Sequence, residues 1–227
     1  MYRLWITLLL LCATGAHAAP QQVSAVYHLS RNGQSFANVT ETFRQEGGHY
    51  KLESITKGIG VYALLGVRRL ASEGEVTPEG LRPTHFEQQQ GDDSKRLITA
   101  DFDWAAGTLT MTAKGKVKTE TLLPGTQDIA SYAYQFMFAP PQGDQVEIPV
   151  TTGKKLRTYL YRIEARAVPV ETAAGSYRTL HFVNATEGGD DKQLWLGVEV
   201  HYIPVRIVMP DENGGTLEQV LTSLRVE

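Results

Sequence analysis

The sequence predicts one mainly β domain, built as a curved antiparallel sheet or incomplete β-barrel with one central helix at about residues 128–138. Short segments rich in β-branched and aromatic residues recur along almost the whole chain. Tight turns such as Arg31-Asn32-Gly33 join neighbouring segments directly. Such turns favour antiparallel pairing, because parallel strands need long crossover connections. Only one segment shows the periodicity of an amphipathic helix.

The predicted strands are bounded by glycine, proline or asparagine. In the first of them, Val23, Ala25, Tyr27 and Leu29 alternate with other residues, as in a strand with one buried face. Similar segments repeat as far as the last residues of the chain. The expected strands cover residues 23–29, 35–45, 49–56, 70–76, 84–90, 96–102, 108–123, 145–151, 156–168, 177–186, 194–201, 205–209 and 216–226.

Residues 128–138 predict the single helix. Asp128 is a favourable N-cap, and Pro140 ends the segment. A helix so apolar should be covered on more than one side, within the concavity of the sheet. Its aromatic residues either close the core or line a ligand cavity. The apolar face comprises Ile129, Tyr132, Ala133, Phe136 and Met137, and Tyr134 and Phe138 continue it around the far side.

The first 18 residues have the three parts of a secretory signal peptide. Arg3 gives a positive start, residues 4–11 are apolar, and Ala16-His17-Ala18 forms a small-residue cleavage site. The apolar stretch is shorter than the roughly 20 residues that span a bilayer, which favours cleavage before Ala19 over a retained anchor. We therefore expect a periplasmic protein in which residues 19–227 form one domain without a transmembrane segment.

Cys12, the single cysteine, lies inside this signal. Leu11 precedes it where a lipidation site would have a small residue, which disfavours a lipoprotein. After cleavage the chain has no cysteine, so disulfides, cysteine nucleophiles and thiolate metal sites are excluded.

Charge and motifs give no sign of catalysis. Without Arg3 the chain has 21 basic and 25 acidic residues, interspersed, which argues against nucleic-acid binding. Glycines at 58 and 60 loosely match a dinucleotide fingerprint but lack the βαβ context. The histidines are scattered, and no nucleophile elbow or P-loop occurs. Asp101 and Asp103 border a turn, as solvated carboxylates do. We expect no enzyme activity, no catalytic residue, no metal and no cofactor.

A second apolar segment, residues 58–66, interrupts the strand pattern. It contains three glycines, at which the backbone can bend. It either packs into the core or forms an apolar flap at a binding surface. An apolar ligand needs more apolar surface than half-buried strands provide, and this segment and the helix offer it. The candidate ligand-binding residues are Ile59, Val61, Tyr62, Leu64, Leu65, Tyr132, Tyr134, Phe136, Phe138 and Trp195.

The stretch from Leu194 to Ile207 predicts a strand edge. Pro204 cannot donate a backbone hydrogen bond, so it marks a strand start or a bulge. Arg206 lies among apolar neighbours and therefore needs a carboxylate or carbonyl partner.

Several short motifs occur in an order that resembles a proteobacterial envelope family classed only as a domain of unknown function. They are Glu73-Gly74, Gly80-Leu81-Arg82-Pro83, Asp128-Ile129-Ala130-Ser131-Tyr132, Gly175-Ser176-Tyr177-Arg178-Thr179, Leu194-Trp195-Leu196 and Pro204-Val205-Arg206-Ile207. The resemblance implies a secreted protein but no activity and no site residue. Its strand-rich layout is similar, at the level of fold, to the periplasmic lipoprotein carriers LolA and LolB, and fold does not establish function.

These observations lead to two functional hypotheses. The first is a monomeric, non-enzymatic periplasmic binding or carrier protein for an apolar, lipid-like ligand. The alternative is an envelope assembly or scaffold protein that binds another protein through a sheet edge or apolar loop. A hydrolase of envelope polymers ranks third, because no acid/base set converges. A carrier needs an open apolar cavity, whereas a scaffold can be solidly packed.

Overall fold

The computed structural model describes residues 19–91, 96–211 and 214–227. The predicted signal peptide and Cys12 lie outside the described residues. The described strands form one fifteen-stranded sheet in the order β8-β7-β6-β5-β4-β3-β2-β1-β15-β14-β13-β12-β11-β10-β9. Their bounds are β1 Gln22–Arg31, β2 Gln34–Glu46, β3 His49–Gly58, β4 Arg68–Thr77, β5 Gly80–Gln90, β6 Ile98–Asp103, β7 Thr108–Ala113, β8 Lys116–Thr121, β9 Gln127–Asp128, β10 Gln145–Thr151, β11 Leu156–Thr172, β12 Gly175–Asn184, β13 Gln193–Gly197, β14 Ile203–Pro210 and β15 Thr216–Val226.

The antiparallel sheet is confirmed. Strands that follow one another along the chain pair in opposite directions, and β1 and β15 pair antiparallel in the middle of the sheet. The exception is β9, whose two residues pair parallel with β10. Val23, Ala25 and Tyr27 are fully buried while the residues between them are partly exposed, as the alternation predicts.

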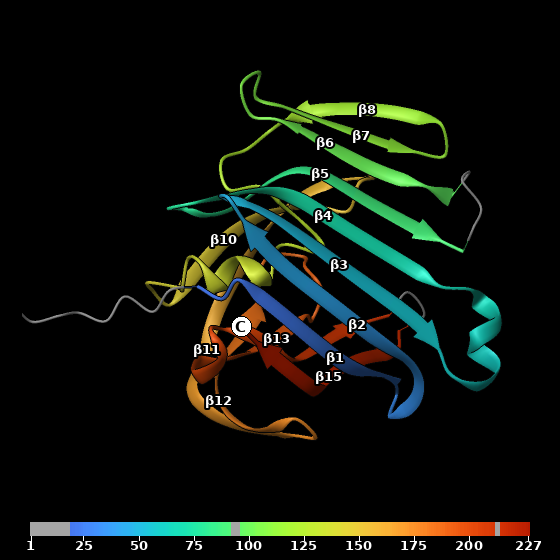
Figure 1. Cartoon of the computed structure of the whole chain (residues 1–227), viewed down its shortest axis with the longest axis vertical. Helices are drawn as coiled ribbons and strands as arrows, with labels where there is room; N and C mark the ends of the chain where they lie inside the picture. The colour runs from blue at the N-terminus through green and yellow to red at the C-terminus, as the bar shows by residue number, and fades with distance from the viewer. Residues whose placement is uncertain (1–18, 92–95, 212–213) are drawn as a thin grey trace, which may run out of the picture.

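The sheet curls on itself but does not close. Its edge strands β8 and β9 are not paired with each other. Figure 1 shows β10 and its neighbours passing behind the strands of the first half. The Gln127 side chain of β9 bridges the two halves, since its Nε2 donates to the Leu81 carbonyl oxygen of β5 at 2.7 Å. The fold is therefore an open, barrel-like sheet.

The predicted helix at 128–138 is wrong. The segment consists of the end of β9, a run of turns and a four-residue 3₁₀ helix, η3 (Tyr134–Met137). We call residues 129–138 the central coil. Bonds from residue i to the carbonyl of i−4 form at Tyr132, Gln135 and Ala139, but Phe138 bonds to i−3. The other described helices are also short 3₁₀ helices, η1 (Gly60–Leu65) and η4 (Val198–Val200).

Packing explains why the α-helix does not form. Ala130, Tyr134 and Met137 point into one hydrophobic cluster, with Phe43, Leu52 and Phe86 among its members. Tyr132, Ala133 and Phe136 point into a second cluster, with Phe182 and Leu196 among its members. Aromatic residues have modest helix propensity, so these contacts outweigh the periodicity. The expectation that the segment is covered on more than one side is confirmed.

Most predicted strands differ from the observed ones by a few residues at their ends, and two differ in a way that changes the fold locally. The strand expected at 108–123 is divided into β7 and β8 by a turn at Lys114 and Gly115, whose φ angles are both positive at 52° and 73°. The strand expected at 194–201 ends at Gly197, and η4 follows it. Left-handed backbone at two successive residues is typical of a tight hairpin turn.

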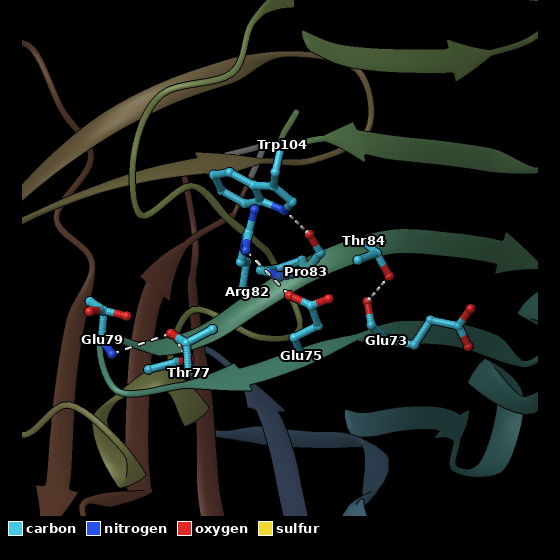
Figure 2. A network of polar contacts seen from close by, with 9 residues as sticks. Glu73, Glu75, Thr77, Glu79, Arg82, Pro83, Thr84 and Trp104 are labelled. Atoms are coloured by element: carbon cyan, nitrogen blue, oxygen red, sulfur yellow. Dashed lines mark hydrogen bonds and ion pairs between the residues drawn. The ribbon is translucent and has the colours of Figure 1, made fainter. Parts of the chain in front are cut away.

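The corner between β4 and β5 contains two of the sequence motifs (Figure 2). A register shift lies between Glu73 and Gly74, where a Cβ on Gly74 would stand 2.2 Å from the Arg82 carbonyl oxygen. Nε1 of Trp104 donates to the Pro83 carbonyl oxygen at 2.7 Å, and the Arg82 guanidinium lies 5.2 Å from the centre of the Trp104 ring. The glycine therefore permits a bulge that the neighbouring side chains hold.

Candidate ligand cavity

The two halves of the sheet and the central coil line a partly open cavity of about 400 Å³. Its volume lies within the range of small-molecule sites, roughly 300–1,000 Å³. Apolar side chains make up most of the wall and polar ones a minority. The apolar lining residues are Leu29, Phe36, Ala37, Val39, Tyr62, Leu65, Leu70, Ile129, Ala130, Tyr132, Ala133, Tyr134, Pro204, Ile207, Met209 and Leu217, and the polar ones are Glu41, Ser54, Thr56, Arg68, Gln90, Lys192 and Gln219, with Gly58 and Gly66.

Four of the ten candidate residues line this cavity. Tyr62 and Leu65 come from η1, and Tyr132 and Tyr134 come from the central coil. The two segments singled out in the sequence, about seventy residues apart, therefore face one shared space. The tyrosines of the coil are buried, whereas Leu65 is largely exposed, so the cavity extends from the core to the surface at η1.

The other candidates lie elsewhere. Ile59, which precedes η1, and Val61 and Leu64 of η1 are exposed and do not line the cavity. Phe136 packs on Phe182 with ring centres 5.4 Å apart, and Phe138 packs on Phe43 at 5.6 Å. Trp195 belongs to a third cluster, beside Tyr27 and Val205 among others.

The surroundings of Trp195 confirm the two predictions made for its strand pair. Its ring stacks on His181 at 4.2 Å, with the Arg206 guanidinium 4.6 Å away. Nε of Arg206 donates to Oε1 of Glu218 at 2.7 Å, which is the expected carboxylate partner. A register shift opposite Pro204 is the expected bulge.

The η1 segment forms an exposed apolar rim of the cavity. No residue of η1 is buried, and Leu64 is 90% exposed. In Figure 1, η1 projects beyond the ends of β3 and β4. Tyr62 packs edge-on against Phe36 at 5.7 Å, and Nε2 of Gln90 donates to the Leu65 carbonyl oxygen at 2.8 Å.

Glu41 is the one carboxylate among the described residues of the mainly apolar wall. The Tyr134 hydroxyl donates to its Oε2 at 2.8 Å, and the Ser54 hydroxyl donates to its Oε1 at 3.1 Å. Burial raises the pKa of the Glu41 carboxyl, although these hydrogen bonds act against the shift. The same surroundings raise the pKa of Tyr134, chiefly through burial.

Two cationic side chains also line the cavity. Nη2 of Arg68 donates to Oε1 of Gln88 at 2.9 Å, and burial lowers the pKa of Arg68. Lys192, from the other half of the sheet, places Nζ 5.1 Å from the centre of the Tyr132 ring and 5.5 Å from that of Tyr159. Electrostatic interaction with Tyr132 raises the pKa of Lys192, and burial opposes it.

A buried network around Asp128 fixes the central coil against the cavity. Oδ1 of Asp128 accepts the backbone N–H groups of Ala130 and Ser131 at 2.8 and 2.9 Å. Oδ2 accepts the Ser72 hydroxyl at 2.5 Å, and Tyr50 hydrogen-bonds to Ser72 in turn. Burial raises the pKa of the Asp128 carboxyl to about 6. Asp128 does not line the cavity, so it supports the wall from behind.

Gln135 fastens the same coil to the corner between β4 and β5. Its Oε1 accepts the Leu81 backbone N–H at 2.6 Å, and its Nε2 donates to the Glu79 carbonyl oxygen at 3.1 Å. Gly80 lies against the Gln135 amide and has a φ of +116°, so a larger residue would both clash and be strained. The Gly80 motif and the coil therefore form one structural unit.

Sequence reasoning missed Glu41, Arg68 and Lys192 as cavity residues. A signal existed for Glu41, because Val39 and Phe43 place it on the buried side of an alternating strand. Arg68 has the same parity as Leu70, which also faces the cavity. Lys192 precedes the short strand β13, and its position depends on contacts across the sheet.

Other chemistry was sought in the described parts of the chain. Within residues 19–91, 96–211 and 214–227 there is no group of three or more histidine, cysteine or acidic residues able to hold a metal ion. Asp101 pairs with His85 at 2.7 Å on the outer surface. None of the helices described is long and apolar enough to cross a membrane.

The fold and cavity together define an open, barrel-like β protein with an internal apolar chamber. A family model described as "Protein of unknown function (DUF3108)" matches residues 25–222, and the chain belongs to that family. No curated protein matches the sequence.

Among solved structures, the chain is similar to a beta-barrel-like protein of the domain of unknown function DUF1849 from Brucella abortus. The TM-score is 0.56 and the identity 11%, over 92% of this chain and 98% of that one. At this identity the likeness concerns the fold alone. It agrees with the open sheet described above, and the likeness to LolA and LolB stays a prediction.

Proposed function

We propose that this protein is a non-enzymatic periplasmic binding or carrier protein that holds an apolar, lipid-like ligand in the cavity. The observation that carries the proposal is the convergence of η1 and the central coil on one chamber of about 400 Å³. The exposed rim gives a ligand a path to the buried tyrosines.

Burial of an apolar chain can provide the binding free energy of such a complex without a specific sequence motif. Each buried methylene contributes about 0.8 kcal/mol, so about ten of them contribute on the order of 8 kcal/mol. That is the free energy of a micromolar complex, before the costs of association are subtracted. A mainly apolar wall is therefore sufficient for binding an acyl chain.

The polar groups of the wall favour binding over hydrolysis. Among the described residues that line the cavity, Glu41 is the one carboxylate. Hydrolysis of glycosidic bonds generally uses a pair of carboxylates, one as acid and one as base or nucleophile. Glu41 accepts hydrogen bonds from Tyr134 and Ser54, which suits a structural anion.

The test is titration of the purified protein with a fluorescent fatty acid, 11-(dansylamino)undecanoic acid, using two matched variants. Leu65 lines the cavity and Leu64 does not, yet both are exposed on the same short helix. We expect Leu65→Asp to weaken uptake at least tenfold, because the carboxylate would enter the apolar rim, and Leu64→Asp to bind like the wild type. No uptake by the wild type would refute a carrier.

A second candidate function is supported by the exposure of Val61 and Leu64, at 77% and 90%. Apolar side chains that point into solvent are typical of a surface that meets another protein. On this alternative the protein is an envelope scaffold that binds a partner through η1. A photo-crosslinking residue at position 64 in cells would then recover one defined protein, and Val61→Ser would abolish that product. A scatter of products unchanged by Val61→Ser would refute it.

A further inference from the structure

We propose that the ligand is a single-chain amphiphile with an acidic headgroup, whose chain occupies the cavity and whose headgroup binds Arg68. This inference rests on the proposed function and names the class of ligand. The headgroup of this ligand is an anion, either a carboxylate or a phosphate, at the end of one apolar chain. The volume of about 400 Å³ lies near the lower end of the range for ligand pockets, which favours one chain over two.

Arg68 stands at the border between the rim and the chamber. It is the first residue of β4, three residues after the end of η1 at Leu65, and it pairs with Thr56 of β3 and Gln90 of β5. All three residues line the cavity. Leu70, two residues further along β4, continues the same wall into the apolar interior. A headgroup at Arg68 thus leaves its chain beside apolar side chains.

The Arg68 guanidinium has more N–H donors than its described hydrogen bond uses. The described structure gives it one side-chain hydrogen bond, to the neutral amide of Gln88. A guanidinium carries five N–H donors in a fork that fits a carboxylate or phosphate. Partial burial of a charge beside a neutral partner is costly, and an anion bound there would offset that cost.

The other charged groups of the cavity are already engaged. Glu41 accepts hydrogen bonds from Tyr134 and Ser54, and Gln219 also hydrogen-bonds to it. Lys192 lies over two tyrosine rings and is close enough to Asp190 to interact with its charge. Glu41 is therefore already hydrogen-bonded and Lys192 already lies against tyrosine rings, which leaves Arg68 as the cation for the headgroup.

The experiment compares charged and uncharged probes of the same chain. The probes are 11-(dansylamino)undecanoic acid and its methyl ester, with dodecyl phosphate as an unlabelled competitor. The variants are Arg68→Met, which keeps the stem, and Arg68→Lys, which keeps the charge. The matched control is Arg69→Met, because Arg69 follows in sequence but lies in a groove on the outer surface with Glu53 and Glu87.

We expect the wild type to bind the acid about tenfold to a hundredfold more tightly than the ester, the range that a charge-assisted hydrogen bond provides. Arg68→Met should abolish this preference while ester binding is unchanged. Arg68→Lys should retain part of it, and Arg69→Met all of it. Competition by dodecyl phosphate that exceeds competition by dodecanoate would identify the headgroup as a phosphate, and the reverse order as a carboxylate.

The outcomes separate the two proposals. Equal binding of acid and ester by the wild type, or equal weakening of both by Arg68→Met, would overturn the headgroup assignment and leave the apolar cavity as the binding site. Failure of the wild type to bind either probe would refute the carrier function itself. Circular dichroism of each variant establishes that it is folded before the titrations are compared.

Discussion

The η1 segment and the central coil are both apolar in sequence but differ in burial. Both are short, apolar and free of regular α-helix, and both face the cavity. Yet no residue of η1 is buried, whereas Tyr132, Tyr134 and Phe136 are each at least 93% buried. Apolar character alone therefore does not decide whether a segment enters the core.

The two segments differ in burial because polar contacts hold the central coil in the core and fewer contacts hold η1. The coil is held by Asp128, which accepts two backbone N–H groups and a serine hydroxyl, and by Gln135, which bonds to two backbone groups at the next corner. The described contacts of η1 include one aromatic pair, Phe36 with Tyr62, and the bond from Gln90 to Leu65. Buried polar groups with several partners order a segment, and sparse contacts at the surface leave it free to open.

The largest expected effect comes from breaking the coil. Phe136→Ala should lower the free energy of unfolding by about 3–5 kcal/mol, because the ring is buried and packs on Phe182. Urea denaturation followed by circular dichroism measures it. A loss below about 1 kcal/mol would show that the coil is not packed as described.

A smaller effect concerns the anchor Asp128 and follows from its pKa. The folded pKa of about 6 lies above the ordinary value of 3.8, so the folded state binds more protons between these pH values. The resulting stabilisation is complete below pH 3.8 and is lost as the pH rises through about 6. The free energy of unfolding should therefore fall by roughly 1–3 kcal/mol from pH 4.5 to pH 7 on account of Asp128.

The matched variant is Asp128→Asn, which keeps an acceptor for the N–H groups of Ala130 and Ser131 but cannot ionise. Urea denaturation of both proteins at pH 4.5 and pH 7 measures the difference. Burial also raises the pKa of Glu41, but this carboxyl is present in both proteins and cancels in the comparison. Equal changes with pH in wild type and variant would rule out Asp128 as the source.

The smallest effect belongs to η1. Leu64→Ser should change the free energy of unfolding by no more than about 0.5 kcal/mol, since the side chain is 90% exposed. Thermal unfolding of the variant beside Phe136→Ala gives the contrast directly. A loss of several kcal/mol at Leu64 would mean that η1 packs on the body of the protein in solution.

Much of the fold is predictable from the sequence because it depends on local signals. Turn residues and alternation mark most strands and their antiparallel order, as in β1, where Val23, Ala25 and Tyr27 are buried. The helix prediction failed because the same aromatic residues that create a periodic face pack in two directions. Periodicity is a local property of the sequence, whereas the position of the two clusters depends on residues from distant strands.

The site was predictable in part for a related reason. Tyr62, Leu65, Tyr132 and Tyr134 lie on the cavity because an excess of apolar residues marks their segments. Arg68, at the start of β4, and Lys192, just before β13, reach it through the curl of the sheet, which places both around one space. Arg68 shares the strand parity of Leu70, but parity does not reveal a cavity, and the position of Lys192 depends on contacts across the sheet.

The strand order also has a consequence for how the chain reaches its native state. Every pairing in the described sheet joins successive strands, with the exception of β1 to β15. This last pairing connects opposite ends of the chain, and non-local pairings of this kind form slowly. Met209 of β14 and Leu217 and Gln219 of β15 line the cavity together with residues of β1, β2 and β3. During folding, the meanders on either side can form early, but the chamber exists only after β15 has joined β1.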